Sequence, residues 1–162
     1  MDNKLFVVFE TSSNIEVYDA QTFNQLSIIR VKVLIEPHDI VASRDDHQLY
    51  VADKDGIWKV STTVRNQYEK WLTTKSVAGT FYITTLSLTS HRLLMASQYP
   101  SLRQYSTTDR QLVCAVELPR YVEDLYHATE TQRGTFVVGH RGTSRDELQY
   151  AVSTNSCYDG RN

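Results

Sequence analysis

The sequence is poor in the residues that mark specialised classes of protein. Its 162 residues include only two cysteines, six glycines and three prolines, which excludes collagen-like, low-complexity and disulfide-rich proteins. No uninterrupted apolar run is longer than Leu5–Phe9, which is far shorter than the roughly 20 residues of a membrane-spanning helix. We therefore expect a soluble globular protein without a membrane partner, and the low cysteine count favours a reducing compartment such as the cytoplasm.

An excess of charge of either sign is also missing. The chain has 17 basic and 19 acidic residues and a formal net charge of -2, and its lysines and arginines are scattered along the sequence. Nucleic-acid binding depends on clustered basic groups that neutralise phosphates. A protein or peptide is therefore the expected partner, and a nucleic acid is disfavoured.

The sequence does contain an internal repeat of short apolar strands. These strands start at Leu5, Leu49, Leu93 and Thr135, which lie 44, 44 and 42 residues apart. Each is followed, after a polar turn, by a second strand, and the intervals hold further short strands rich in valine, isoleucine and tyrosine. Because no stretch shows a helical period and four short strands in about 40–50 residues are typical of one blade, the pattern predicts a β-propeller.

The order of these strands predicts an all-β partial propeller with two complete four-stranded antiparallel blades flanked by two three-stranded ones. The expected blades span residues 5–31, 37–72, 81–118 and 121–153, and a polar tail follows at 154–162. Propellers typically close with about four to eight blades. We therefore expect a fragment of a longer propeller, in which the exposed faces of the terminal blades favour self-association.

The second repeat carries a family resemblance. Leu49–Val60 resembles the core of an NHL repeat, Leu5–Asp19 follows the same outline, and Pro37–Ala42 resembles the innermost strand of that family. Ser97 and Gly139 stand where the family has aspartate. The resemblance implies a six-bladed, TolB-like scaffold whose loops at one end of the channel bind protein or RNA, although likeness of fold does not transfer function.

Candidate binding residues follow from this arrangement. The entries of the innermost strands are expected to lie on the axial side, and the candidate residues there are His38, Asp39, Tyr82, Glu123 and Asp124. Glu123 and Asp124 are adjacent and point to opposite faces of their strand, one toward the channel and one toward a neighbouring blade. The turns after the next strand are expected to form a loop rim that contains Asp53, Asp55, His140 and Arg141. A rim of mixed charge suits a protein or peptide partner, so the leading hypothesis is a non-catalytic binding scaffold without a cofactor.

A metal-dependent lyase or hydrolase at the axis is the alternative hypothesis. A lyase group on a similar six-bladed scaffold holds zinc through histidines from several blades, and its Pro-His dipeptide is similar to Pro37–His38. Catalytic zinc takes about three protein ligands, but the matching positions of the next repeats fall near Tyr82 and Glu123. The Asp53–Gly56 segment has too few oxygen ligands for a calcium loop and instead predicts a hairpin turn. We therefore assign no catalytic or metal-binding residue and expect no enzymatic activity.

Overall fold

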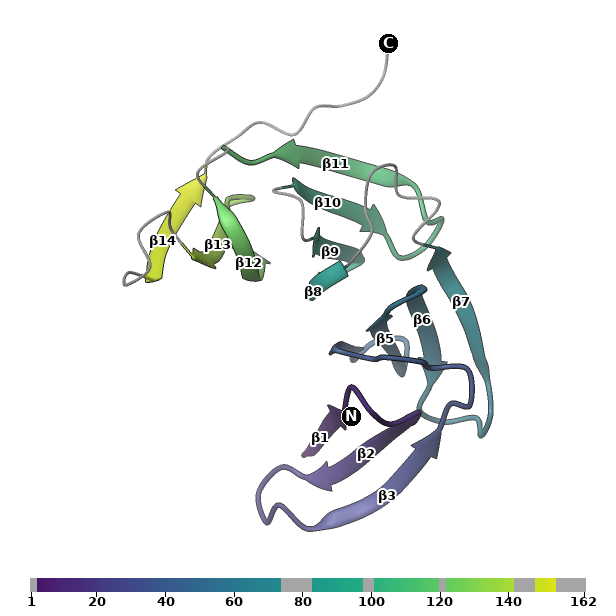
Figure 1. The fold of residues 1–162 in the computed structure, drawn as a ribbon. Helices are drawn as coiled ribbons and strands as arrows, with labels where there is room; N and C mark the ends of the chain where they lie inside the picture. The colour runs from purple at the N-terminus through teal and green to yellow at the C-terminus, as the bar shows by residue number, and fades with distance from the viewer. Residues whose placement is uncertain (1–2, 74–82, 98–100, 120–121, 142–147, 154–162) are drawn as a thin grey trace. The chain divides into compact units, whose positions relative to one another are not determined.

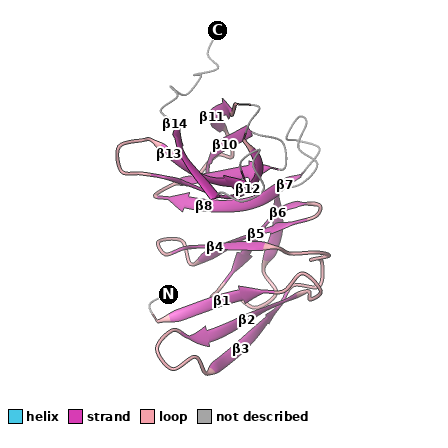
Figure 2. Cartoon of the chain, turned by 60° about the vertical axis from the view of Figure 1, so that its left-hand side comes forward, coloured by secondary structure: helices cyan, strands magenta, loops and turns pink. Residues whose placement is uncertain are grey.

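The structure, a computed structural model, describes residues 3–73, 83–97, 101–119, 122–141 and 148–153. For residues 123, 141 and 148–153 it describes the backbone alone. The described residues form strands and turns without a helix (Figure 2), so they include no helix that is long and apolar enough to cross a membrane.

The strands form four antiparallel sheets in which neighbours in sequence pair with each other (Figure 1). The first sheet contains β1 (Lys4–Val8), β2 (Asn14–Asp19) and β3 (Gln25–Arg30), and the second contains β4 (Asp39–Ser43), β5 (Gln48–Asp53), β6 (Gly56–Ser61) and β7 (Tyr68–Thr73). The third contains β8 (Ile83–Thr89), β9 (Arg92–Ser97), β10 (Ser101–Ser106) and β11 (Leu112–Glu117), and the fourth contains β12 (Glu123–Glu130), β13 (Phe136–Arg141) and β14 (Leu148–Ser153). The predicted all-β order of three, four, four and three strands is confirmed.

The chain divides into two compact units of two sheets each, unit 1 at Met1–Ser76 and unit 2 at Val77–Asn162. In unit 1, the first two sheets share one core of buried aliphatic residues: Ile15, Val31, Leu34, Leu49, Val51 and Val60. Burying an aliphatic side chain of this size contributes about 1.5–3 kcal/mol. Ile15 of β2 and the alternating positions Leu49 and Val51 of β5 therefore help to hold the two sheets of unit 1 together.

The two sheets of unit 2 are joined by apolar packing and by polar contacts. Leu94 of the third sheet and Phe136 and Val138 of the fourth belong to the same buried cluster. The Thr85 hydroxyl lies 3.0 Å from Nδ1 of His127, so the chemistry that joins these sheets includes side-chain hydrogen bonds. The predicted tail at 154–162 lies outside the described residues.

One observation differs from the expectation drawn from cysteine content. Cys114 is buried in β11 and is disulfide-bonded, while Cys157, the other cysteine of the chain, lies outside the described residues. Disulfides persist mainly in oxidising compartments. The reducing compartment that the low cysteine count favoured therefore loses its support.

Candidate functional site

The turn between β5 and β6 forms one side of the candidate site. Asp53 pairs with Gly56 across the hairpin, as the sequence predicted, and Lys54 and Asp55 lie exposed at its tip. Gly56 has a φ of 139°, and a Cβ there would meet the Leu72 carbonyl oxygen at 2.1 Å. Only glycine combines that backbone angle with so close an approach, which explains why the hairpin takes this sharp form.

Asp53 joins this turn to the loop that precedes β4. Its side chain is fully buried, and its Oδ1 accepts hydrogen bonds from the backbone N–H groups of Ile35 at 3.0 Å and Glu36 at 2.7 Å. The backbone N–H of His38 donates to the Ala52 carbonyl at 3.0 Å. Asp53 was predicted to lie on the loop rim, and this prediction is wrong, because its carboxylate is directed inward to hold the loop.

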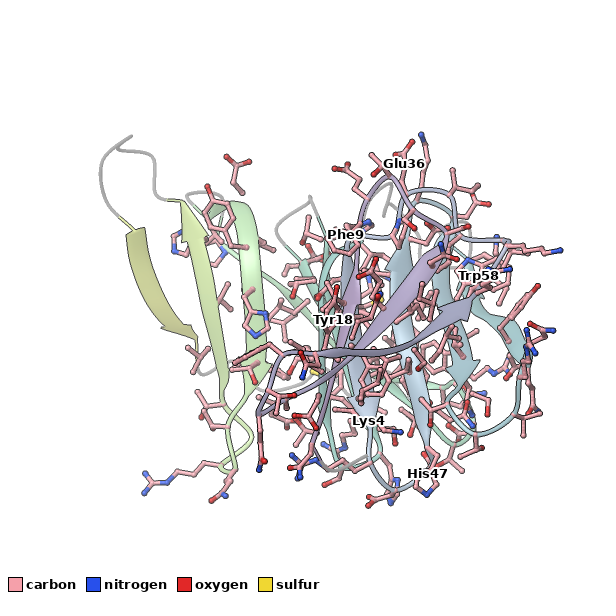
Figure 3. All side chains as sticks on the ribbon, turned by 90° about the horizontal axis from the view of Figure 1, so that it is seen from below. Lys4, Phe9, Tyr18, Glu36, His47 and Trp58 are labelled. Carbon is pink, nitrogen blue, oxygen red and sulfur yellow. The ribbon has the colours of Figure 1, made fainter. Side chains whose placement is uncertain are left out.

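The side chains presented by this anchored loop and turn form a surface that we call the unit 1 rim, defined as Glu36, His38, Asp39, Lys54 and Asp55. The Lys54 ammonium lies 2.7 Å from the Glu36 carboxylate, and Nδ1 of His38 lies 3.0 Å from the Glu36 carbonyl oxygen. Figure 3 shows Glu36 at one end of unit 1 and Lys4 and His47 at the other. Three predicted residues, His38, Asp39 and Asp55, therefore share one end of the second sheet.

Trp58 and Lys70 support the rim from the side. The Lys70 ammonium lies 3.2 Å from the Asp55 carboxylate and 5.0 Å from the centre of the Trp58 ring. The Tyr68 ring meets Trp58 edge-on, with ring centres 6.3 Å apart. Lys70 thus balances the charge of Asp55 while its ammonium lies over an aromatic face.

Glu36 and Asp55 of the rim are each paired with a lysine, and this limits the chemistry of the rim. Exposed ion pairs contribute only about 0–1 kcal/mol, so a partner can exchange Glu36–Lys54 for its own contacts at little cost. Across the residues that the structure describes, no three His, Cys, Asp or Glu side chains gather in a way that could hold a metal ion. The rim is therefore suited to hydrogen bonding and charge pairing with a polar surface.

The remaining predicted site residues belong to unit 2. Tyr82 lies outside the described residues, and Glu123 pairs through its backbone with Arg141 at the start of β12. The register skips Asp124, whose φ is 45°, so this exposed residue is the extra residue of a β-bulge. His140 was predicted to lie in a rim turn, but β13 continues through it and its side chain is fully buried. That prediction is wrong, because His140 is not accessible to a partner.

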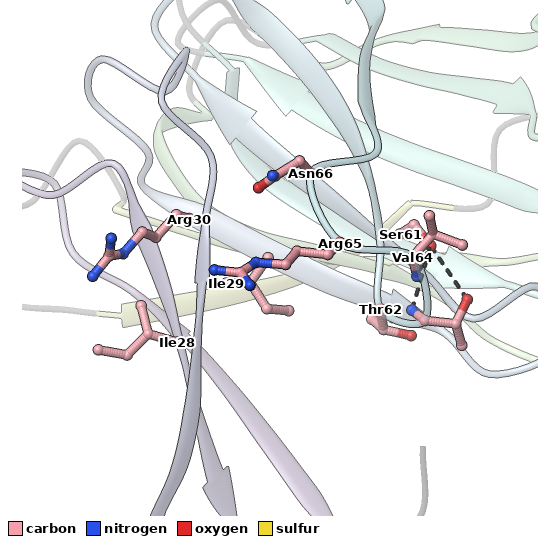
Figure 4. Close-up of a pocket in the computed structure, with 9 residues that line it drawn as sticks. Ile28, Ile29, Arg30, Ser61, Thr62, Val64, Arg65 and Asn66 are labelled. Carbon is pink, nitrogen blue, oxygen red and sulfur yellow. Dashed lines mark hydrogen bonds between the residues drawn. The ribbon is translucent and has the colours of Figure 1, made fainter.

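The sequence analysis missed a groove of about 410 Å³ in unit 1, between β3 and the β6–β7 turn (Figure 4). It is lined by two arginines, three hydroxyl side chains, one amide and three aliphatic side chains, namely Arg30, Arg65, Ser61, Thr62, Thr63, Asn66, Ile28, Ile29 and Val64. Each arginine alone reads as one of the scattered charges of the chain. The groove forms only because β3 and the β6–β7 turn of the neighbouring sheet lie close together. The sequence pattern predicts both segments but not their approach.

Sequence comparison gives no relative for this chain. No family model matches it, and no curated protein matches it.

Comparison of structures does give matches. The Kuenenia stuttgartiensis hydrazine synthase is similar with a TM-score of 0.67 at 12% identity, over 93% of this chain and 42% of that one. The WD40 beta propeller domain of Doa1 matches with a TM-score of 0.64 at 10% identity, over 86% of this chain and 44% of that one. The chain has a partial β-propeller fold. This propeller chain also matches the computationally designed Ika4 protein, with a TM-score of 0.60 at 14% identity, over 94% of this chain and 86% of that one.

These propeller matches concern the fold alone, because identities of this size do not carry function. The chain spans less than half the length of the hydrazine synthase and Doa1 chains that it matches. The four sheets identified from the repeat are therefore blades, and what they bind has to be argued from their own side chains.

Proposed function

We propose that this propeller chain is a non-catalytic binding scaffold of the NHL/TolB-like type, whose unit 1 rim contacts a protein or peptide partner. The observation that carries the proposal is the buried Asp53 carboxylate, which holds the Ile35–Glu36 backbone at 2.7–3.0 Å. An anchored loop loses little conformational freedom when a partner binds. Rigid support under exposed polar side chains favours recognition.

The charge of the rim supports a protein or peptide as the partner. Glu36 and Lys54 present both signs within 2.7 Å of each other, and the chain as a whole carries a formal charge of only -2. Such a surface gives a polyanion no continuous positive field to follow. A polypeptide instead offers carboxylates, ammonium groups and amides that match both signs.

Charge reversal on the rim tests this proposal. The chain, its Lys54→Glu variant and its Lys4→Glu variant are used as baits, and retained proteins are quantified by mass spectrometry. Lys4 is exposed at the opposite end of unit 1 (Figure 3), so Lys4→Glu matches the change of charge away from the rim. We expect partners retained by the chain and by Lys4→Glu to be lost with Lys54→Glu. Equal retention by all three baits would refute the assignment of the rim.

Elemental analysis separates the scaffold from the alternative of a metal-dependent lyase or hydrolase. The scaffold requires no bound metal, so the purified chain should contain less than stoichiometric zinc, iron, manganese and calcium. Stoichiometric metal that survives dialysis would contradict the non-catalytic proposal and favour the alternative.

A further inference from the structure

We infer that the groove between β3 and the β6–β7 turn of unit 1 binds an acidic peptide, which adds as an extra strand along β3 and places an acidic side chain against Arg65 on one face and another against Arg30 on the other. This site lies on a different surface from the unit 1 rim and does not depend on it. The two arginines come from different blades and line the same groove. In Figure 4, the Arg65 side chain extends from the turn toward β3.

Both guanidinium groups are available to an anion. Arg30 and Arg65 are exposed, neither takes part in an ion pair with any residue in the described ranges, and none of the nine lining residues is acidic. At the unit 1 rim, by contrast, Lys54 and Lys70 are both paired with carboxylates. Arginine presents a planar fork of donors that matches the oxygens of a carboxylate or phosphate. The groove is therefore a local excess of positive charge on a nearly neutral chain.

The turn that carries Arg65 is held in place before any ligand arrives. The Ser61 hydroxyl accepts hydrogen bonds from the backbone N–H groups of Thr63 at 3.3 Å and Val64 at 3.1 Å. The backbone N–H and the hydroxyl of Thr62 both donate to the His47 carbonyl, at 3.0 and 2.9 Å. Because hydrogen bonds to Ser61 and to His47 fix this turn, it positions Arg65 with little loss of conformational entropy on binding.

The edge of β3 supplies backbone partners along the same groove. β3 is an edge strand of the first sheet, and the Val31 N–H donates to the Ser13 carbonyl on the β2 side at 3.1 Å. Hydrogen-bonding direction alternates along an antiparallel strand, so the backbone groups of Ile28 and Arg30 point away from β2. An extended peptide can pair with these groups as strands do in β-augmentation.

The apolar lining favours a peptide over a nucleic acid. Ile28 is 48% exposed and Val64 is 53% exposed, and both line the groove beside the arginines. The lining contains no aromatic ring on which a base could stack. Successive side chains of a strand point to opposite faces, and Arg30 lies on the face of β3 away from Arg65 (Figure 4). A segment with apolar and acidic residues in pairs would cover the aliphatic side chains and present one carboxylate to each arginine.

Fluorescence anisotropy with the full chain tests this inference. The probe is a short fluorescein-labelled peptide that repeats Val-Val-Glu-Glu, so that it has glutamates on both faces, and two further versions carry glutamine or phosphoserine in place of glutamate. Each guanidinium supplies charge-assisted hydrogen bonds to a glutamate of the peptide, so Arg30→Ala and Arg65→Ala should each weaken binding of the glutamate peptide about tenfold. Arg44→Ala removes an exposed arginine from the β4–β5 turn and should leave the affinity unchanged.

The peptide versions separate the sources of the negative charge. The glutamine peptide should bind at least about tenfold more weakly than the glutamate peptide. Tighter binding of the phosphoserine peptide would assign the natural ligand to phosphorylated segments, and equal or weaker binding would assign it to carboxylates. Hydrogen exchange at the Ile28 and Arg30 amides should slow when the peptide binds, because an added strand protects both amides.

Several outcomes would overturn the inference. They are equal affinity for the glutamine and glutamate peptides, an Arg44→Ala loss as large as that of Arg65→Ala, unchanged exchange at Ile28 and Arg30 in the saturated complex, and absence of binding by both acidic peptides. Binding of a single-stranded oligonucleotide in preference to both acidic peptides would also overturn it. The Lys54→Glu variant of the rim should bind the acidic peptide as the parent does, so failure here is distinguishable from failure of the proposed function.

Discussion

The carboxylate of Asp53 offers the sharpest test of how unit 1 positions its rim. Asp53→Ala removes the acceptor of two backbone hydrogen bonds from Ile35 and Glu36. Each bond to a charged acceptor is worth about 1.5–3 kcal/mol. Because the donors are only partly buried, water recovers part of this energy. We expect the free energy of unfolding of unit 1 to fall by about 2–4 kcal/mol.

Asp53→Asn should behave differently, because the two oxygens of the carboxylate have different surroundings. Oδ1 accepts both N–H groups, whereas the buried Oδ2 has no hydrogen-bond partner among the described residues. Asparagine keeps an acceptor oxygen in place of Oδ1 and puts an uncharged amide group in place of Oδ2. A neutral acceptor is weaker than a charged one, but the lower cost of burial offsets part of the difference. We expect a loss of about 1 kcal/mol or less.

Guanidinium unfolding followed by tryptophan fluorescence measures both effects. The two tryptophans of the chain, Trp58 and Trp71, both lie in the second sheet, so the signal reports on unit 1. Asp45→Ala, in the exposed β4–β5 turn, is the control and should change the free energy by no more than about 0.5 kcal/mol. Equal losses for Asp53→Ala and Asp53→Asn, or an alanine effect as small as the control, would refute the anchoring role of the Oδ1 hydrogen bonds.

Three further predictions use other features of the two units. Gly56→Ala should lower the free energy of unfolding by about 3 kcal/mol or more, because it adds a backbone clash to a strained φ. Gly134→Ala has a strained φ without a clash and should lower it by about 1 kcal/mol. Thermal unfolding followed by circular dichroism measures both. Cys114 should resist iodoacetamide in guanidinium until a reductant is added, because it is disulfide-bonded; labelling without reductant, seen by peptide mass spectrometry, would contradict this. Hydrogen bonds from Thr22 and Gln21 lower the pKa of Asp19, so its stabilising contribution is present at neutral pH and is lost as the pH falls through that lowered pKa. Thr22→Ala removes the hydroxyl donor and keeps the Thr22 backbone N–H, so it should raise the pKa that NMR measures for Asp19 in part, and an unchanged value would contradict the contribution of the hydroxyl.

Much of the fold could be predicted from the sequence because the repeat fixes both the number and the order of strands. The segment Glu69–Leu72 has only a weak apolar pattern in the sequence, and it too forms a strand, within β7. The apolar pattern before the last repeat extends only over Val122–His127, whereas β12 continues to Glu130. Ala128–Glu130 lacks a strong apolar alternation, and it becomes a strand through pairing with Phe136–Val138. Strand ends that depend on a partner cannot be found from local propensity.

Less of the candidate site could be predicted, because its organisation depends on contacts between distant segments. An aspartate next to a polar turn reads as an exposed residue, and only the approach of the Ile35–Glu36 backbone makes Asp53 a buried acceptor. His140 was placed in a turn because polar residues follow it, whereas pairing with Leu125 and Gln149 extends the strand through it. The local pattern could not distinguish these cases.

The end of β5 also has a consequence for how divergence among such repeats is recognised. β5 closes with a carboxylate that binds a neighbouring loop, whereas β9 closes with Ser97, whose buried hydroxyl lies 3.4 Å from that of Ser101. The second strand of these two blades thus ends in side chains of unrelated chemistry. A sequence profile built from one blade would therefore score the other blade poorly, whereas the similarity of the two blades is plain from the geometry of their strands.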